Sequence, residues 1–394
     1  MTKMESNQLT ELSVAQWQEL IAGCAEKATS DPYRINYGNE VRSIARPFMS
    51  ELTTEEAWLF ELNVGLFLLR KQSTGRHSGY FAQVAASETM HDIECHLNSG
   101  KPQDIVTKQL ARLLETVAYI RDTAIANAGS PPAYLEIYVE LWIHLISSST
   151  EAHRLFKEEL ACLAQGVSMG NELFPLIARA WMHFWLGEDQ EAWRLLEAAE
   201  RHRLVPGQIF RFLRLLEENG EWARLEAWLS HCATERVGRS PGSLDEYGRY
   251  WGAIVQVLPE AEERMWSAIT SLLPYSSSLY VETLMRFGHW RQWIDYQLSL
   301  GSDPLDFLAR DLKPIEKEAP EALLPFYHQG VEKYVLLKNR DGYKRAVKLL
   351  KRLAKLYKKL KREQRWEAYI ETFASRHSRL RALQEELRRG GLIP

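Results

Sequence analysis

Lysine and arginine side chains recur every three or four residues in one segment, where their cationic heads could bind phosphate or carboxylate groups. Residues 338–365 contain thirteen Lys and Arg against Asp341 and Glu363, whereas the whole chain has a formal net charge of −3. At about 100° per residue, most of these cations converge on one side of a helix. We define the basic ridge as Lys344, Arg345, Lys348, Lys351, Arg352, Lys355, Lys358, Lys359 and Arg362.

The other side of the same segment is apolar, so the pattern predicts one helix with a buried arc behind the cations. That arc consists of Ala346, Leu349, Leu350, Leu353, Leu356, Tyr357 and Leu360. A face that serves solubility alone usually mixes signs, whereas like charges four residues apart repel. Two interpretations remain, namely a solvated helix face and a surface for an anionic partner, which is either nucleic acid or an acidic protein. A membrane surface is disfavoured because the arc has no Trp or Phe to anchor in headgroups.

Two further residue patterns carry potential chemistry. The run GVSMG at residues 166–170 has the Gly-x-Ser-x-Gly form of a nucleophile elbow, but it lies between two helical patterns and lacks the preceding strand that positions the serine. It is therefore interpreted as a turn between helices. His91, Glu94 and Cys95 share a helix face and would supply half of a metal site, yet no second ligand pair is visible.

The remaining patterns favour a protein without catalytic or cofactor chemistry. No glycine-rich phosphate loop and no supported pairing of carboxylates or of Cys with His occurs in the sequence. The four cysteines show no Cys-x-x-Cys spacing. The amino-terminal residues have no apolar core of the signal-peptide kind, and no run approaches eighteen apolar residues. We therefore expect a cytoplasmic protein with no metal, no cofactor, no membrane contact and no enzymatic activity.

Helical periodicity recurs in almost every segment, so the predicted fold class is all-α. Hydrophobic residues make up 45% of the chain and charged residues 26%, as in ordinary folded proteins. Ser13 and Gln16 form a capping box ahead of the first amphipathic stretch. The Gly-Ser-Pro-Pro run at residues 129–132 is the strongest candidate boundary, and it predicts a helical region over residues 1–130.

The middle of the chain repeats a helix–turn–helix unit with a glycine at the turn. Gly187, Gly220 and Gly288 mark these turns, and Trp222 and Trp290 follow two of them at the same offset. The first two glycines are 33 residues apart and the last two are 68 apart, close to the tetratricopeptide period of about 34. The prediction is a tetratricopeptide-like α-solenoid over residues 131–340, followed by a basic amphipathic helix and a capping helix over residues 341–394.

The carboxyl-terminal residues resemble the corresponding end of bacterial SWIM zinc-finger proteins, most specifically in RHSRLRALQEEL at residues 376–387. The helical repeats from about Asn171 resemble the repeat region of the same family. That resemblance implies association with DNA and with Swi/Snf-class helicases. The family's zinc finger uses a Cys-x-Cys and a Cys-x-His pair, and this chain contains neither, so the zinc is not carried over.

Together these patterns predict a non-enzymatic helical-repeat scaffold or adaptor. It would bind a protein partner on its repeat surface and nucleic acid or an acidic partner on the basic ridge. The alternative from another class is a tetratricopeptide-like regulatory receptor for a peptide or protein ligand, which a polar, acidic concave groove would favour.

Overall fold

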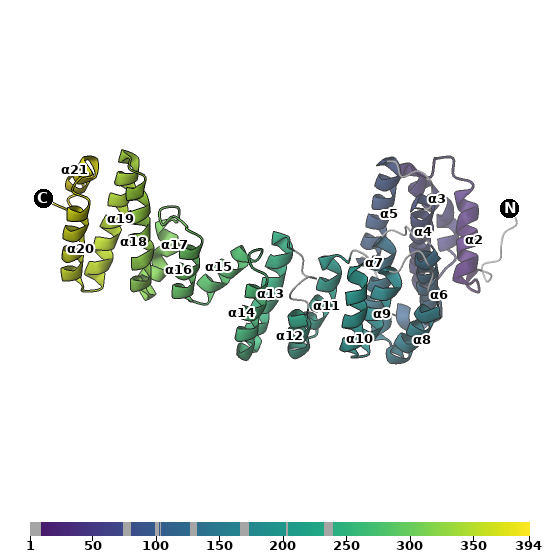
Figure 1. The fold of residues 1–394 in the computed structure, drawn as a ribbon. Coiled ribbons are helices and arrows are strands. Elements are labelled where there is room, and N and C mark those ends of the chain that lie inside the picture. Colours follow the sequence, from purple (N-terminus) through teal and green to yellow (C-terminus); the bar gives the residue numbers. More distant parts are fainter. Residues whose placement is uncertain are drawn as a thin grey trace. The chain divides into compact units, whose positions relative to one another are not determined.

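A computed structural model describes residues 9–73, 80–98, 102, 104–126, 132–165, 173–201, 204–231 and 239–394. Every regular element in these ranges is helical, with twenty α-helices and three single-turn 3-10 helices, and no strand occurs among them (Figure 1). The all-α prediction is confirmed. None of the described helices combines the length and apolar character needed to cross a bilayer.

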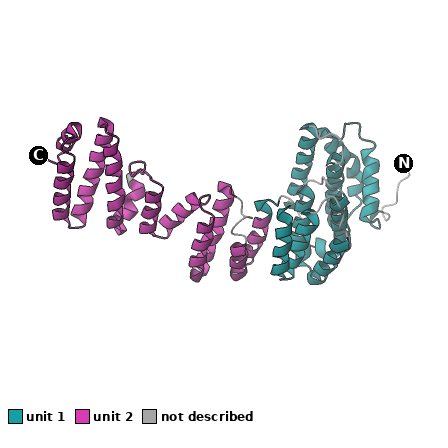
Figure 2. Cartoon of the chain, viewed as in Figure 1, with its two compact units in different colours: residues 1–208 teal, residues 209–394 magenta. Residues whose placement is uncertain are grey.

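The chain divides into two units, residues 1–208 and residues 209–394 (Figure 2). Of the boundary expected at residues 129–132, residues 129–131 lie outside the described ranges, and Pro132 begins α7.

The first unit surrounds one central helix, α4 (Thr54–Ser73). Most of α4 is buried all round, and α2, α3, α5 and α6 pack against it. The capping box predicted at Ser13 is present, because Ser13 Oγ accepts from the Gln16 backbone and Gln16 Oε1 accepts from the Ser13 backbone. The other helices of this unit are α2 (Val14–Ala25), α3 (Ile35–Met49), α5 (Tyr80–Asn98), α6 (Ile105–Ala126), α7 (Pro132–His144), η1 (Ile146–Ser148), α8 (Ala152–Gln165), α9 (Leu173–Trp185) and α10 (Asp189–Glu200).

The second unit consists of successive helices, beginning with α11, whose first three residues precede the boundary. Its helices are α11 (Pro206–Glu218), α12 (Trp222–His231), α13 (Pro241–Val257), η2 (Pro259–Ala261), α14 (Glu262–Ser271), α15 (Ser277–Arg286), α16 (Trp290–Ser299), α17 (Ala309–Glu318), η3 (Pro320–Ala322), α18 (Leu323–Leu336), α19 (Arg340–Lys359), α20 (Glu363–Arg376) and α21 (Arg381–Arg389).

The glycine turns occur where the sequence predicts them. Gly187, Gly220 and Gly288 have φ values of +75°, +69° and +72°, in the left-handed region that glycine occupies without a steric cost. At each turn the next residue donates its backbone N–H to a carbonyl five residues earlier, as Glu188 does to His183 at 2.9 Å. This hydrogen bond closes the end of one helix and directs the chain into the next. The local helix–turn–helix units are therefore confirmed.

Replacing Gly187 with alanine is expected to lower the free energy of unfolding by about 1 kcal/mol, because a Cβ is disfavoured at positive φ. Nothing lies within 4 Å of the position that this Cβ would occupy, so the cost would come from the backbone alone. Gly23 lies inside α2 in equally open space, at an ordinary helical φ, and Gly23→Ala should stabilise by up to about 1 kcal/mol. Urea unfolding followed by circular dichroism measures both changes. Equal changes in the free energy of unfolding for the two substitutions would contradict the assignment of the Gly187 cost to its positive φ.

Candidate anion-binding surface

Eight of the nine residues of the basic ridge lie on α19, which forms as one continuous helix. Asn339 caps its first turn by accepting a hydrogen bond from the Gly342 backbone N–H at 2.7 Å. The helix ends at Lys359, so Arg362, the last member of the ridge, lies beyond it at the residue that precedes α20. The break is a turn in which Lys361 adopts a φ of +55°. The predicted single helix is thus present, but it is shorter than the cation pattern.

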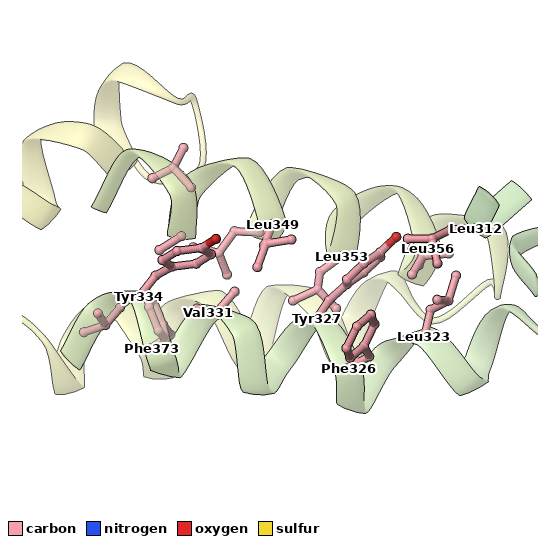
Figure 3. Close-up of a cluster of buried hydrophobic side chains, with 14 of the residues drawn as sticks. Leu312, Leu323, Phe326, Tyr327, Val331, Tyr334, Leu349, Leu353, Leu356 and Phe373 are labelled. Carbon is pink, nitrogen blue, oxygen red and sulfur yellow. The ribbon is translucent and has the colours of Figure 1, made fainter. Parts of the chain in front are cut away.

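The apolar arc of α19 is buried against its neighbours. Five predicted arc residues are at most 2% exposed, whereas Tyr357 and Leu360 are only partly buried because they lie at the carboxyl-terminal end. Figure 3 shows Leu349, Leu353 and Leu356 directed toward α18. There they face Leu323, Phe326, Tyr327, Val331 and Tyr334. This interlocked core fixes the rotation of α19 about its axis and so decides which side chains reach solvent.

Eight of the nine ridge residues are exposed, and Arg352 is half-buried. Three of the nine have partners on their own or neighbouring helices. Arg345 Nε lies 3.1 Å from Asp341 Oδ2. Arg352 donates to the Pro304 carbonyl at 3.4 Å and lies over the ring of Tyr327, while Lys359 donates to the carbonyl of Glu316. These three cations have local structural roles beside the buried core.

The other six cations lie along the exposed line of the ridge. In the part of the chain that the structure describes, no hydrogen bond or ion pair is made by the side chains of Lys344, Lys348, Lys351, Lys355, Lys358 and Arg362. Lys344 lies near the carboxylate of Glu386 on α21 and contributes to the lowered pKa of that group. Like charges at this spacing repel by a few tenths of a kcal/mol per pair. The line is therefore an electrostatically unsatisfied surface.

The other sequence candidates do not gather into a site. Residues 166–170, the Gly-x-Ser-x-Gly run, lie outside the described ranges. Cys95 Sγ lies 3.6 Å from His91 Nε2, but no group of three or more His, Cys, Asp or Glu among the described residues is placed to hold a metal ion. The adjacent His96 stacks on Trp58 and its Nε2 lies 2.9 Å from the Trp58 carbonyl oxygen, which is a packing role.

Sequence reasoning missed the contribution of α21. Glu386 is buried and accepts from Arg340 Nε at 2.9 Å, and Glu385 lies 3.3 Å from Arg340 Nη2. This hydrogen bond from Arg340 is the main reason that the pKa of Glu386 is below its ordinary value. The contact holds α21 beside the first turns of α19 and places Arg388 and Arg389 in the same region of charge. The sequence does show a short amphipathic helix with a basic last turn. It does not show that Glu386 pairs with Arg340, because the two residues are 46 apart in the chain.

Comparison with known proteins gives little functional information. No family model matches the chain. The chain is 41% identical over 194 residues to the uncharacterized protein YwqB of Bacillus subtilis strain 168. That match covers 47% of this chain and 36% of the relative, so the chain spans well under half the length of the protein it matches. Because the relative is itself uncharacterized, the similarity assigns neither an activity nor a partner.

Proposed function

We propose that the protein is a non-enzymatic helical-repeat scaffold whose basic ridge binds the phosphate backbone of nucleic acid. The observation that carries this proposal is the line of six cations, five on α19 and Arg362 just beyond it, whose side chains have no hydrogen-bond or ion-pair partner among the described residues. A folded protein gains nothing from aligning repelling charges, so an external anion is the reason we assign to them.

Phosphate fits this line better than a carboxylate-bearing protein does. Residues three or four apart on a helix rise about 4.5–6 Å along its axis, so successive lysines present charge at regular short intervals. Each contact with a phosphate releases condensed counterions, which adds favourable entropy that an isolated carboxylate does not supply. Lysine is a point charge that positions a backbone without reading bases. The expected binding is therefore indifferent to sequence and strongly dependent on salt.

The rest of the proposal concerns the helical repeats. Glycine turns spaced by 33 and 68 residues, each joining two helices, support a tetratricopeptide-like arrangement that offers a surface for a protein partner. The resemblance of residues 376–387 to SWIM-family proteins supports a Swi/Snf-class helicase as that partner. A scaffold that holds such an enzyme and contacts DNA phosphates needs no catalytic residues of its own.

Reversing three charges of the ridge tests the proposal. The variant Lys348→Glu, Lys351→Glu, Lys355→Glu is expected to weaken binding to labelled DNA by more than about 100-fold, because three contacts are lost and three repulsions are added. For the parent protein, log Kd should rise with log salt with a slope of about 0.7–0.9 per phosphate contacted. Fluorescence anisotropy at several salt concentrations measures both quantities.

The control carries the same charge change far along the chain from the ridge. Arg46→Glu, Lys71→Glu, Lys157→Glu alters three exposed cations of the first unit and should leave most of the DNA affinity intact. Circular dichroism should show the same helix content in both variants, since no buried residue is changed. Salt-insensitive binding, no binding by the parent, or equal loss in the two triple variants would each refute a phosphate-binding ridge.

A further inference from the structure

The cations of α19 continue onto α21, the last helix of the chain. The Arg340 contact to Glu386 fixes α21 beside the first turn of α19. Farther along, a Cβ on Gly390 would lie 2.7 Å from Val347 Cγ1, so the end of α21 is in close contact with the second turn of α19. Both contacts join the amino-terminal part of α19 to the carboxyl-terminal end of α21. Figure 1 shows the two helices in the same carboxyl-terminal group.

Glu386 lies where the two sets of cations meet. Arg340, Arg389 and Lys344 all act on this one carboxylate, and Arg389 Nη1 lies 4.0 Å from Glu386 Oε1. Glu385 also lies 3.3 Å from Arg340 Nη2, but two carboxylates do not neutralise three cations, so positive charge remains on both sides of Glu386. Arg389 is 73% exposed, and Arg388 is exposed and donates to the Pro394 carbonyl. The surface therefore has two neighbouring sets of cations, the basic ridge along α19 and the Arg388–Arg389 pair at the end of α21.

Neither α19 nor α21 has an exposed aromatic ring. Tyr343 of α19 is 5% exposed, and Tyr357 is partly buried and hydrogen-bonds to His328 at 3.1 Å. No aromatic residue occurs in α21. Proteins that bind single strands rely on aromatic side chains on which bases stack, at about 1–3 kcal/mol per base. Among the described residues of α19 and α21, this surface has the charge of a nucleic-acid site without an exposed aromatic ring on which bases could stack.

We infer that the surface formed by α19 and α21 binds double-stranded nucleic acid, with the basic ridge on one phosphate strand and Arg388 and Arg389 on the other. This inference rests on the proposed function and names its ligand class. Packed helices lie about 8–10 Å apart, between the widths of about 6 and 12 Å of the two grooves of B-form DNA. Flexible Lys and Arg side chains span the remaining difference. A duplex also presents twice the charge per unit length of one strand.

Anisotropy with matched probes tests the inference on the full chain. The probes are a duplex DNA, a duplex RNA and a single-stranded DNA of equal length, each at several salt concentrations. We expect the parent to bind the duplexes at least about tenfold more tightly than the single strand. Replacing both Arg388 and Arg389 with glutamine should weaken duplex binding about three- to tenfold and lower the salt slope by about 1–2, because one or two phosphate contacts are lost. Single-strand binding should change less than twofold.

The control Arg46→Gln, Lys71→Gln removes two exposed cations from the first unit and should change neither affinity. Two outcomes would overturn the duplex-binding surface of α19 and α21 while leaving the ridge proposal intact. One is equal affinity for the single strand and the duplex, and the other is full duplex affinity in the variant Arg388→Gln, Arg389→Gln. Binding of no probe at any salt concentration would instead remove the proposed function.

Discussion

Replacing Arg121 with methionine is expected to lower the free energy of unfolding of the first unit by about 3–5 kcal/mol at pH 7, because it leaves a buried carboxylate without its cation. Arg121 of α6 donates to Glu159 Oε2 of α8 at 2.7 Å. Tyr138 of α7 donates to the other carboxylate oxygen at 2.8 Å. The side chain of Glu159 is 9% exposed and that of Arg121 is 13% exposed. Water therefore cannot replace the lost partner.

The same substitution should show a marked pH dependence. Burial raises the pKa of Glu159 above its ordinary value of 4.5, and Arg121 limits that rise. A carboxyl whose folded pKa exceeds its unfolded value contributes most stability below the unfolded pKa, and loses it as pH rises through the folded pKa. Without Arg121 the folded pKa rises further. The destabilisation by Arg121→Met should therefore be small near pH 4 and grow toward pH 8.

Denaturant unfolding of the parent and the variant from pH 4 to pH 8 measures this difference. The double variant Arg121→Met, Glu159→Gln removes both charges and keeps an acceptor for Tyr138, so it should recover most of the lost stability. A loss that is independent of pH, or a double variant as unstable as the single one, would show that packing of the Arg121 side chain matters more than its charge.

The sequence predicted what depends on near neighbours along the chain. The capping box at Ser13, the glycine turns and the buried arc of α19 depend on residues within one or two helical turns. It also predicted which side of α19 carries cations, because helical geometry alone separates Leu353 from Lys355.

Features that depend on distant residues could not be predicted in this way. The pairing of Arg121 with Glu159 joins residues 38 apart in sequence, and that of Arg340 with Glu386 joins residues 46 apart. Each side chain alone has the appearance of an ordinary surface charge. The end of α19 at Lys359 was also missed, because the amphipathic pattern continues through Leu360 to Arg362 although the backbone turns at Lys361. Periodicity reports the side of a helix that a residue occupies and does not report its terminus.

The buried arc of α19 gives the second large expected effect. Leu353 is fully buried against α18 (Figure 3), and Leu353→Ala should lower the free energy of unfolding of the second unit by about 2–5 kcal/mol, through lost burial and a residual cavity. Leu336, at the end of α18, is 72% exposed, so Leu336→Ala should change stability by less than about 0.5 kcal/mol. Denaturant unfolding followed by circular dichroism compares the two Leu→Ala substitutions directly.

Combining this stability measurement with DNA binding separates the two sides of α19. At low temperature, where Leu353→Ala remains folded, its DNA affinity should equal that of the parent, because every cation of the basic ridge is retained. The ridge triple variant should show the reverse, with full stability and lost affinity. If Leu353→Ala lost DNA binding while its helix content and cooperative unfolding were unchanged, the anion-binding surface would depend on the fine rotation of α19. Binding would then need α18 and α19 to hold the lysines in register, and charge alone would not explain it.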